Sequence, residues 1–389
     1  MNKKILRIVI TGGPCGGKTT ALEHISKIFR EKGYTVLTVN ETATELINDG
    51  IRPFGTKKEK LKLIDFQRLV LETQLYKEMI RDEAAKACSN DKVVILYDRG
   101  ILDNRAYITH KEFKALADAK GLTEADILSR YDLVLHLVTA AVGQEKYYSN
   151  ATNPARTEDP EAARSLDRKT MEAWSTHPNQ YIFGNDCLFD EKINRVGNRI
   201  REFLGDKMVV DRQKYVIEIK DLDLSSFQGL NLIREEIEEF VRSDNDNENE
   251  MFRKTTLKGN ENSSYYTYTR IIYNEDGTKS TTQRNITENE YLDNLSRLAY
   301  GEPIKKVRYN FIHNGERFRM DFYTDTNEFM TLERDVTNPK KENLPEFIKS
   351  ATNITNNRSY SSANIYKVIN KHREREAKNE EFKKFRLTL

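Results

Sequence analysis

The spacing of hydrophobic residues changes near residue 205 and divides the chain into two halves. In the first half, short runs that are apolar throughout alternate with longer stretches in which apolar residues recur at helical spacing. This pattern predicts a parallel β-sheet covered by helices on both faces. The expected strands are residues 5–10, 35–39, 92–98, 133–138 and 180–183, and a long helix is expected at 57–88.

After residue 205, apolar and polar residues alternate with a period of two, which is typical of strands with two different faces. Turn sequences such as His313-Asn314-Gly315 separate these segments. The pattern predicts an antiparallel α+β domain with a helix at 288–298. Its expected strands are residues 214–219, 265–273, 279–284, 307–312, 317–323 and 329–336.

The same alternation is expected to place charged side chains on one face of the antiparallel sheet. An open sheet with a solvated face is the usual explanation for such a pattern. A closed barrel would instead turn this face into a tunnel lined with basic groups. The residues concerned are Arg253, Lys258, Arg270, Arg284, Lys306, Arg308, Arg317, Arg319, Asp321 and Glu333.

Polar segments complete the predicted organisation. Residues 243–250 read as an acidic loop, and residues 352–362, rich in Asn and Ser, read as a linker. The last stretch, 367–386, is predicted to be a solvated charged helix, with contact to a membrane surface or an acidic partner as the alternative. We therefore predict domains at 1–205 and 206–350, followed by a linker and helix at 351–389.

A glycine-rich loop follows the first predicted strand and carries the most specific motif of the chain. Gly12, Gly17, Lys18 and Thr19 have the G-x-x-x-x-G-K-[ST] spacing of a phosphate-binding loop. Its backbone N–H groups and the positive end of the next helix would bind phosphate oxygens. We expect Lys18 to reach the β- and γ-phosphates of ATP or GTP, and Thr19 to ligate Mg²⁺. The whole predicted nucleotide-binding loop comprises Gly12, Gly13, Pro14, Cys15, Gly16, Gly17, Lys18, Thr19 and Thr20.

Active groups in parallel sheets lie at the carboxyl ends of the strands, and three charged residues occupy such positions. Asp98 and Arg99 end the third predicted strand, and Glu41 follows the second. Asp98 is predicted to hold Mg²⁺ through water or to accept a proton from an acceptor hydroxyl, while Arg99 would bind a phosphate or the substrate. Gln67 is a weaker candidate for reading an acceptor base or sugar, because glutamine on a helix is usually solvated.

The segment between the fourth and fifth predicted strands is rich in arginine. Arg156, Arg164 and Arg168 are placed to form a mobile lid that brings positive charge over a transferring phosphate. The alternative is that they pair with neighbouring acidic residues on a solvated helix. Asn185, after the fifth predicted strand, is a candidate for contact with the nucleotide base.

Composition narrows the choice of partners and compartment. With 63 Lys and Arg against 61 Asp and Glu, bulk nucleic-acid binding is not expected. The 3 cysteines are widely spaced and form neither a disulfide framework nor a zinc motif, which favours a reducing compartment. Because the first predicted strand leads directly into the phosphate-binding loop, we expect no signal peptide and a cytoplasmic protein, with at most peripheral contact to anionic lipid.

Three strings in the first half, TGGPCGGKTT, YDRG and ARTEDPEAARSLDRKTMEAWSTHPNQYIFGN, resemble the kinase-like P-loop domain of the TRPL translocation defect protein family. That domain is similar to the ribosylnicotinamide-kinase and deoxynucleoside-kinase branch of P-loop folds. The resemblance covers roughly residues 4–205 and implies bound ATP or GTP with Mg²⁺.

Two strings in the second half, YYTYTRIIYNEDGTKSTTQRNITENEYLDNL and VRYNFIHNGERFRMDFYTDTNEFMTLERDV, look like a CYTH, or triphosphate-tunnel, domain over roughly residues 207–350. Catalytic members of that fold open with a Glu-x-Glu-x-Lys strand that holds metal. Here Lys214 matches the lysine and neither glutamate is present. The resemblance therefore implies a basic cavity for a polyanion and speaks against metal-dependent triphosphate hydrolysis. The predicted polyanion-binding residues are Lys214, Arg253, Arg270, Arg284, Arg308 and Arg319.

Two classes of function fit these features. In the first, a phosphotransferase or NTPase uses Lys18, Asp98, Arg99, Glu41, Arg156 and Arg164 to move the γ-phosphate to water or to a small hydroxyl-bearing or phosphorylated acceptor. In the second, a nucleotide-dependent switch with little catalysis changes how the second domain holds a phosphoinositide or other polyanion. An enzyme that processes RNA or polyphosphate ends is a third alternative that charge and the missing glutamates disfavour.

Overall fold

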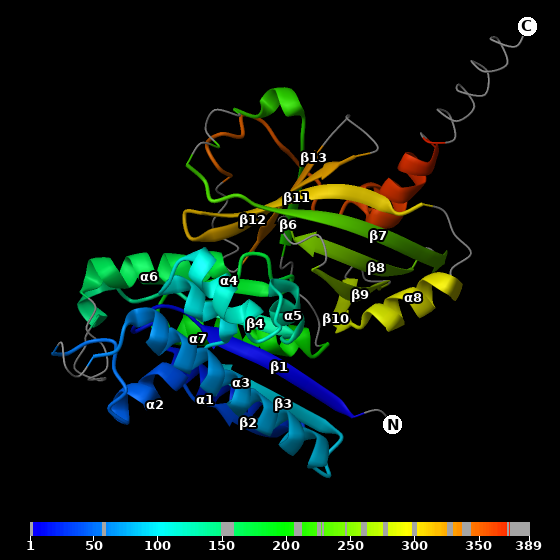
Figure 1. Cartoon of the computed structure of the whole chain (residues 1–389). Helices are drawn as coiled ribbons and strands as arrows, with labels where there is room; N and C mark the ends of the chain where they lie inside the picture. Colours follow the sequence, from blue (N-terminus) through cyan, green and yellow to red (C-terminus); the bar gives the residue numbers. More distant parts are fainter. Residues whose placement is uncertain are drawn as a thin grey trace, which may run out of the picture. The chain divides into compact units, whose positions relative to one another are not determined.

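A computed structural model describes residues 3–56, 60–148, 159–205, 212–223, 227, 229–245, 247–257, 263–274, 279–297, 302–324, 330–336, 344–371 and 373 (Figure 1). The chain divides into two compact units. The first is formed mainly by residues up to Asp206 and the second mainly by later residues. Each unit is described by itself.

The first unit contains a parallel sheet of 5 strands in the order β2-β3-β1-β4-β5. Its strands are β1 (Lys4–Thr11), β2 (Thr35–Val39), β3 (Lys92–Asp98), β4 (Leu133–Leu137) and β5 (Gln180–Phe183). All lie where the apolar runs predicted them, which confirms the parallel α/β arrangement. The strands are continuously apolar because helices cover both faces and leave no solvated side.

Helices connect these strands. They are α1 (Lys18–Glu31), α2 (Thr42–Asn48), α3 (Leu63–Ala87), α4 (His110–Asp118), α5 (Glu124–Ser129), α6 (Pro160–Ala173) and α7 (Phe189–Phe203), with short 3₁₀ turns η1 (Ile101–Ala106) and η2 (Glu145–Tyr147). The long helix expected at 57–88 is α3, whose first residue is Leu63.

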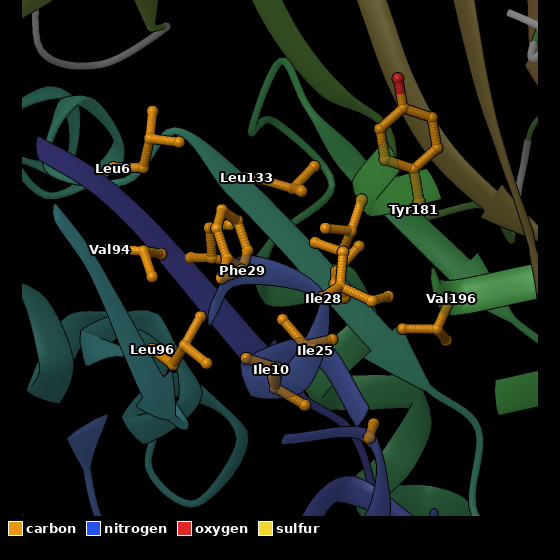
Figure 2. Close-up of a cluster of buried hydrophobic side chains, with 14 of the residues drawn as sticks. Leu6, Ile10, Ile25, Ile28, Phe29, Val94, Leu96, Leu133, Tyr181 and Val196 are labelled. Carbon is orange, nitrogen blue, oxygen red and sulfur yellow. The ribbon is translucent and has the colours of Figure 1, made fainter. Parts of the chain in front are cut away.

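Helices α1 and α7 pack on one face of the parallel sheet through a shared apolar cluster (Figure 2). Leu6 and Ile10 of β1 meet Ile25 and Phe29 of α1 there, and Val196 of α7 joins them. The alternation of side chains along β1 sends its even-numbered residues to this face. This packing fixes the start of α1 directly beyond the end of β1, where the glycine-rich loop lies.

The strand register brings the ends of three strands together. Ile10 of β1 is paired with Asp98 of β3, and Thr11 is paired with His136 of β4. The residues that follow β1 and β3 therefore emerge next to one another at the carboxyl edge of the sheet.

The second unit contains a sheet of 9 strands in the order β10-β9-β8-β7-β11-β12-β13-β6-β14. Its elements are β6 (Arg212–Ile217), η3 (Ile219–Asp221), β7 (Ile233–Asn245), β8 (Glu248–Leu257), β9 (Ser264–Tyr273), β10 (Lys279–Ile286), α8 (Glu288–Arg297), β11 (Ile304–His313), β12 (Glu316–Tyr323), β13 (Met330–Asp335), β14 (Thr352–Asn353) and η5 (Arg358–Tyr360). Every pair with a defined register in this sheet is antiparallel. Over the described ranges, β10 and β14 form the two edges of the sheet, so its hydrogen bonds do not close into a barrel.

Strands β7 and β8 are central in this sheet, although the sequence did not predict them. The predicted acidic loop at 243–250 is wrong, because β7 extends to Asn245 and β8 begins at Glu248. The sequence did not predict β7 because Glu235 and Glu239 point to the buried face, where a sheet usually carries apolar residues. Their charges are compensated by neighbouring strands, as described below.

Residues that were expected to form a linker belong to the second unit. Thr352–Asn353 pairs with β6, and residues 362–371 are helical. Ile365 and Ile369 of this helix pack on Ile304 and Tyr323 of the sheet. Of the predicted C-terminal helix, residues 372 and 374–386 lie outside the described residues. Within the described chain, every helix is too short or too polar to traverse a lipid bilayer.

Candidate functional site

The glycines of the loop between β1 and α1 are required by close packing. A Cβ at Gly12 or Gly16 would overlap the carbonyl oxygen of Leu137 at the end of β4. Gly17 has φ +90°, and a Cβ there would meet the ring of Phe189. A positive φ is accessible to glycine at little cost. The loop is therefore a closely packed turn whose shape depends on these glycines.

Lys18 and the two threonines occupy the first turn of α1. Lys18 is buried, and its Nζ donates to the carbonyl oxygens of Gly12 at 3.2 Å and Gly13 at 3.0 Å. Thr19 and Thr20 are exposed at the helix start. Cys15 adopts a positive φ of 57°, and Pro14 accepts a hydrogen bond from the Thr139 hydroxyl. The lysine ammonium is thus curled over the loop at the positive end of a helix.

Asp167 of α6 holds the glycine-rich loop by a hydrogen bond. The sequence did not predict this role for Asp167. Its Oδ1 accepts from the backbone N–H of Gly13 at 2.6 Å and of Thr139 at 3.2 Å, and lies 3.1 Å from Nε2 of His136. Burial alone would raise the pKa of this carboxyl, but His136 and the two N–H groups lower it. The sequence gives no signal for this role, because Asp167 looks like one more acidic residue on a charged helix.

Asp98 ends β3 beside the loop, as its position predicted. Within the described part of the chain, its buried Oδ1 has no hydrogen-bond partner. Burial raises the pKa of Asp98, while the nearby charge of Lys18 opposes that rise. A buried carboxylate oxygen without a partner is unfavourable for stability unless water or a ligand satisfies it.

Glu41 and Arg99 form an ion pair at the same edge. Arg99 Nε donates to Glu41 Oε1, and the Thr44 hydroxyl donates to Glu41 Oε2 at 3.0 Å. Burial would raise the pKa of Glu41, but the charges of Arg99 and Lys18 lower it to about 2. Arg99 has a positive φ of 69° and is buried. The charges of Lys18, Glu41, Asp98 and Arg99 therefore lie close enough to influence one another.

The remaining predicted residues of this unit differ in their environments. Gln67 of α3 is buried, and the structure describes no hydrogen-bond partner for its Oε1, which does not fit a solvated helix position. Arg164 is exposed on α6 and donates to the Ala141 carbonyl at 2.9 Å. Arg168 is exposed on the same helix, and Arg156 lies outside the described residues.

Asn185 links two loops. Its Nδ2 donates to the carbonyl oxygens of Thr139 at 2.7 Å and Val142 at 2.8 Å, and its Oδ1 accepts from Lys192 at 2.8 Å. Lys192 also donates to Gly16 at 3.2 Å, and burial lowers the pKa of its ammonium to about 8. The amide of Asn185 is therefore engaged in holding the loops that follow β4 and β5.

In the second unit, one face of the sheet is both charged and buried. Arg308 and Arg319 are 5% and 3% exposed, and Asp321 is 2% exposed. Arg319 Nη2 donates to Asp335 at 2.6 Å. The usual explanation, an open sheet with a solvated charged face, does not describe this arrangement. Buried charges of this kind persist when they are paired.

Lys214 and Arg253 lie on this same face. Lys214 Nζ donates to the Tyr360 carbonyl at 3.3 Å, and burial lowers the pKa of its ammonium. Arg253 Nε donates to Glu239 at 2.9 Å. The charges of Lys306 and Arg253 outweigh burial and lower the pKa of Glu239 to about 2.

Arg270 and Arg284 are on the opposite face, which corrects the prediction that all these basic residues share one face. Arg253 is opposite Thr267 on β9, so Arg270, an odd number of residues further along, points the other way. Both arginines are exposed and pair with glutamates, Arg270 with Glu248 and Arg284 with Glu290. Periodicity across several strands could not reveal this, because it depends on the register between β8, β9 and β10.

Comparison with known families supports the prediction of a P-loop domain for the first unit. Residues 7–191 match a family model described as an AAA domain. Together with the loop geometry and the 5-strand parallel sheet, this match defines the first unit as a P-loop NTPase-like domain. A search of curated proteins finds no match. The family match does not extend to the antiparallel sheet, for which the CYTH resemblance stays a prediction.

Proposed function

We propose that the first unit binds ATP or GTP with Mg²⁺ and transfers the γ-phosphoryl group to a small hydroxyl-bearing acceptor. The observation that carries this proposal is the buried, unpartnered oxygen of Asp98 at the strand end next to the P-loop. A P-loop site that only binds nucleotide uses an acidic residue at this strand end to hold Mg²⁺, whereas a transferase uses it to orient a hydroxyl. The Arg99–Glu41 pair beside Asp98 favours the transferase, because it supplies contacts for an acceptor.

Each residue has a distinct part in this reaction. The loop N–H groups and Lys18 bind the β- and γ-phosphates, and Lys18 stabilises charge on the transferring group. Asp98 orients the acceptor hydroxyl and accepts its proton. Arg99, held by Glu41, binds the acceptor side, and Gln67 is a candidate to contact the acceptor through its buried amide. Positioning and electrostatics account for most of the rate enhancement in this class of reaction.

The residues present fit a magnesium ion. The Thr19 hydroxyl is exposed at the start of α1 and would ligate the ion directly. Asp98 would hold the ion through a water, since its unpartnered Oδ1 is assigned to the acceptor hydroxyl. Among the described residues there is no group of three histidine, cysteine or acidic side chains that could hold a metal. Mg²⁺ at nucleotide sites is usually held by one or two protein ligands together with waters and phosphate oxygens. When bound, the ion would neutralise phosphate charge.

For the second unit we propose that the buried charged face binds a polyanion, in line with its resemblance to CYTH domains. Lys214, Arg253, Arg308 and Arg319 on that face support the proposal. Arg270 and Arg284 are not part of it.

A nucleotide-dependent switch is the second candidate function for the first unit. It is favoured by Asp167, which connects α6 to the P-loop, so that a change at the nucleotide could move α6. In that case hydrolysis would be slow and no acceptor would be phosphorylated.

The decisive experiment follows the labelled γ-phosphate of ATP and GTP in the presence of a panel of nucleosides and nucleotides. We expect label on an acceptor with the wild type and none with Lys18→Ala. Lys27→Ala is the matched control, because Lys27 is a strongly exposed lysine on the same helix. Label that stays on the nucleotide, or leaves only as slow free phosphate, would favour the switch. Unchanged nucleotide affinity in Lys18→Ala would refute the P-loop assignment itself.

A further inference from the structure

Asp103, in η1 just after the Asp98-Arg99-Gly100 turn, is the centre of a buried hydrogen-bond network. It is 2% exposed. Its Oδ1 accepts from the Thr11 hydroxyl at the end of β1, and Arg99 Nη1 lies 3.4 Å from the same oxygen. Its Oδ2 accepts from the Gly100 N–H at 3.0 Å. One carboxylate thus joins the strand that leads into the P-loop to the turn that carries Arg99.

A fourth donor connects this carboxylate to α6. Trp174 caps the C-terminus of α6, and its Nε1 donates to Asp103 Oδ2 at 3.0 Å. The indole is fully buried, and a Cβ at Gly100 would lie 2.7 Å from it. The ring therefore packs directly on the turn between Arg99 and η1, and it also meets Tyr131 edge-on.

Helix α6 also contacts the nucleotide-binding loop, through the same face that carries Trp174. Asp167 and Trp174 are seven residues apart, which places them on one side of a helix two turns apart. Asp167 holds the N–H of Gly13 in the P-loop, while Trp174 holds Asp103. A continuous series of contacts therefore runs from Gly13 through α6 to Asp103, Arg99 and Glu41.

We propose that Asp103 is a positioning residue that, through Trp174 and α6, couples the Arg99–Glu41 pair on the acceptor side to the nucleotide-binding loop. The inference rests on the proposed phosphotransfer. Asp103 does not touch the reacting atoms. It orients Arg99, whose positive φ would otherwise be disfavoured, and it keeps the charge of the guanidinium directed at Glu41.

The chain offers a direct probe of this coupling, because Trp174 is its single tryptophan. Its emission reports on the surroundings of the indole. Since Trp174 is fully buried, a change on nucleotide binding would not come from direct contact between the indole and the ligand. We expect wild-type emission to change when MgATP is added, and Asp103→Asn to bind MgATP with no such response.

Kinetics supply the second readout. For the nucleoside or nucleotide that receives label in the wild-type assay, Asp103→Asn should raise KM or lower kcat by about 10- to 100-fold, while the MgATP dissociation constant stays within a few-fold. Trp174→Phe keeps an aromatic ring against Gly100 and removes the N–H, so it should act in the same direction. Because both changes act on one contact, the double variant should be little worse than Asp103→Asn alone.

Asp126→Asn serves as the control, because Asp126 accepts hydrogen bonds in the capping box of α5, an exposed structural role. Wild-type protein that binds MgATP with no change in emission overturns the coupling. So do variants whose nucleotide affinity and turnover fall together, in step with their melting temperature. Wild-type protein that does not bind MgATP at all removes the proposed function, and this inference with it.

Discussion

Arg308 on β11 and Asp321 on β12 form a buried two-bond ion pair, with Nε–Oδ1 at 2.6 Å and Nη2–Oδ2 at 2.8 Å. Burial opposes both charges, but each group holds the other ionised: the pKa of Arg308 stays well above its usual value and that of Asp321 well below. The charged face of the second unit is therefore largely self-compensated. An anion that binds there must exchange some of these internal contacts for its own.

Lys214 offers a test of anion binding, because its ammonium donates to a backbone carbonyl and burial lowers its pKa, against the opposing charge of Glu333 on the neighbouring strand. In full-length protein carrying Lys18→Ala, we expect Lys214→Gln to weaken the binding of inorganic tripolyphosphate by about tenfold, the effect of losing one charged hydrogen bond. Arg284→Gln, on the opposite exposed face, should leave the affinity unchanged. Calorimetric titration would measure both. Equal losses of affinity in the two variants would mean that tripolyphosphate responds only to the overall charge of the protein. If tripolyphosphate does not bind the protein in which Lys214 is intact, the polyanion proposal is wrong.

Asp98→Asn should separate function from stability. Because burial disfavours the Asp98 carboxylate, and its Oδ1 has no described partner, removing the charge should leave the melting temperature equal or higher. Transfer of the γ-phosphate should fall by about 100-fold or more, as for loss of a general base. Thermal unfolding and a labelled-phosphate assay give the two numbers. A loss of melting temperature with retained transfer would assign Asp98 a structural role.

Asn185→Ala tests whether this residue reads the nucleotide base. Its amide bridges carbonyls of two loops and receives Lys192, so we expect a loss of about 1–3 kcal/mol in the free energy of unfolding. The ratio of ATP to GTP affinity should not change. Denaturant unfolding and competition binding would show this. A shifted ratio with unchanged stability would instead support the base-contact role predicted from the sequence.

Glu78 should make the stability of the first unit depend on pH. This carboxyl is buried on α3, accepts from the Tyr131 hydroxyl at 2.5 Å, and has its pKa raised by burial to about 7 from 4.5. Because the folded state binds the proton more tightly than the unfolded state, its contribution to stability is present below pH 4.5 and is lost as pH rises to about 7. The loss is at most about 3 kcal/mol.

Glu78→Gln removes that titration and should flatten the dependence of melting temperature on pH between about 5 and 8. Glu112→Gln, in the exposed capping box of α4, is the control and should leave the slope of the wild type. A slope at Glu78→Gln equal to that of the wild type would place the titration elsewhere.

The sequence was sufficient to predict those elements whose structure depends on neighbouring residues alone. The strand, glycine-rich loop and helix around Gly12 to Lys18, and the apolar runs of the parallel sheet, could be read because fully buried strands are apolar on both faces and P-loop glycines have a fixed spacing. The same reasoning placed Asp98 at a strand end, where the structure finds its unpartnered oxygen. It failed at β7, because buried glutamates look like a solvated segment until the arginines opposite them are known.

What the sequence by itself determined is thus the P-loop, the parallel α/β arrangement of the first unit and the alternating strands of the second. Only the tertiary structure decided which charged residues share a face, as the separation of Arg284 from Arg308 shows. It also decided that Asp103 and Asp167, unremarkable in sequence, hold the two sides of the site. The physical reason is that strand register and contacts between distant segments fix these relationships. A charged side chain carries no local mark of the partner that it will meet.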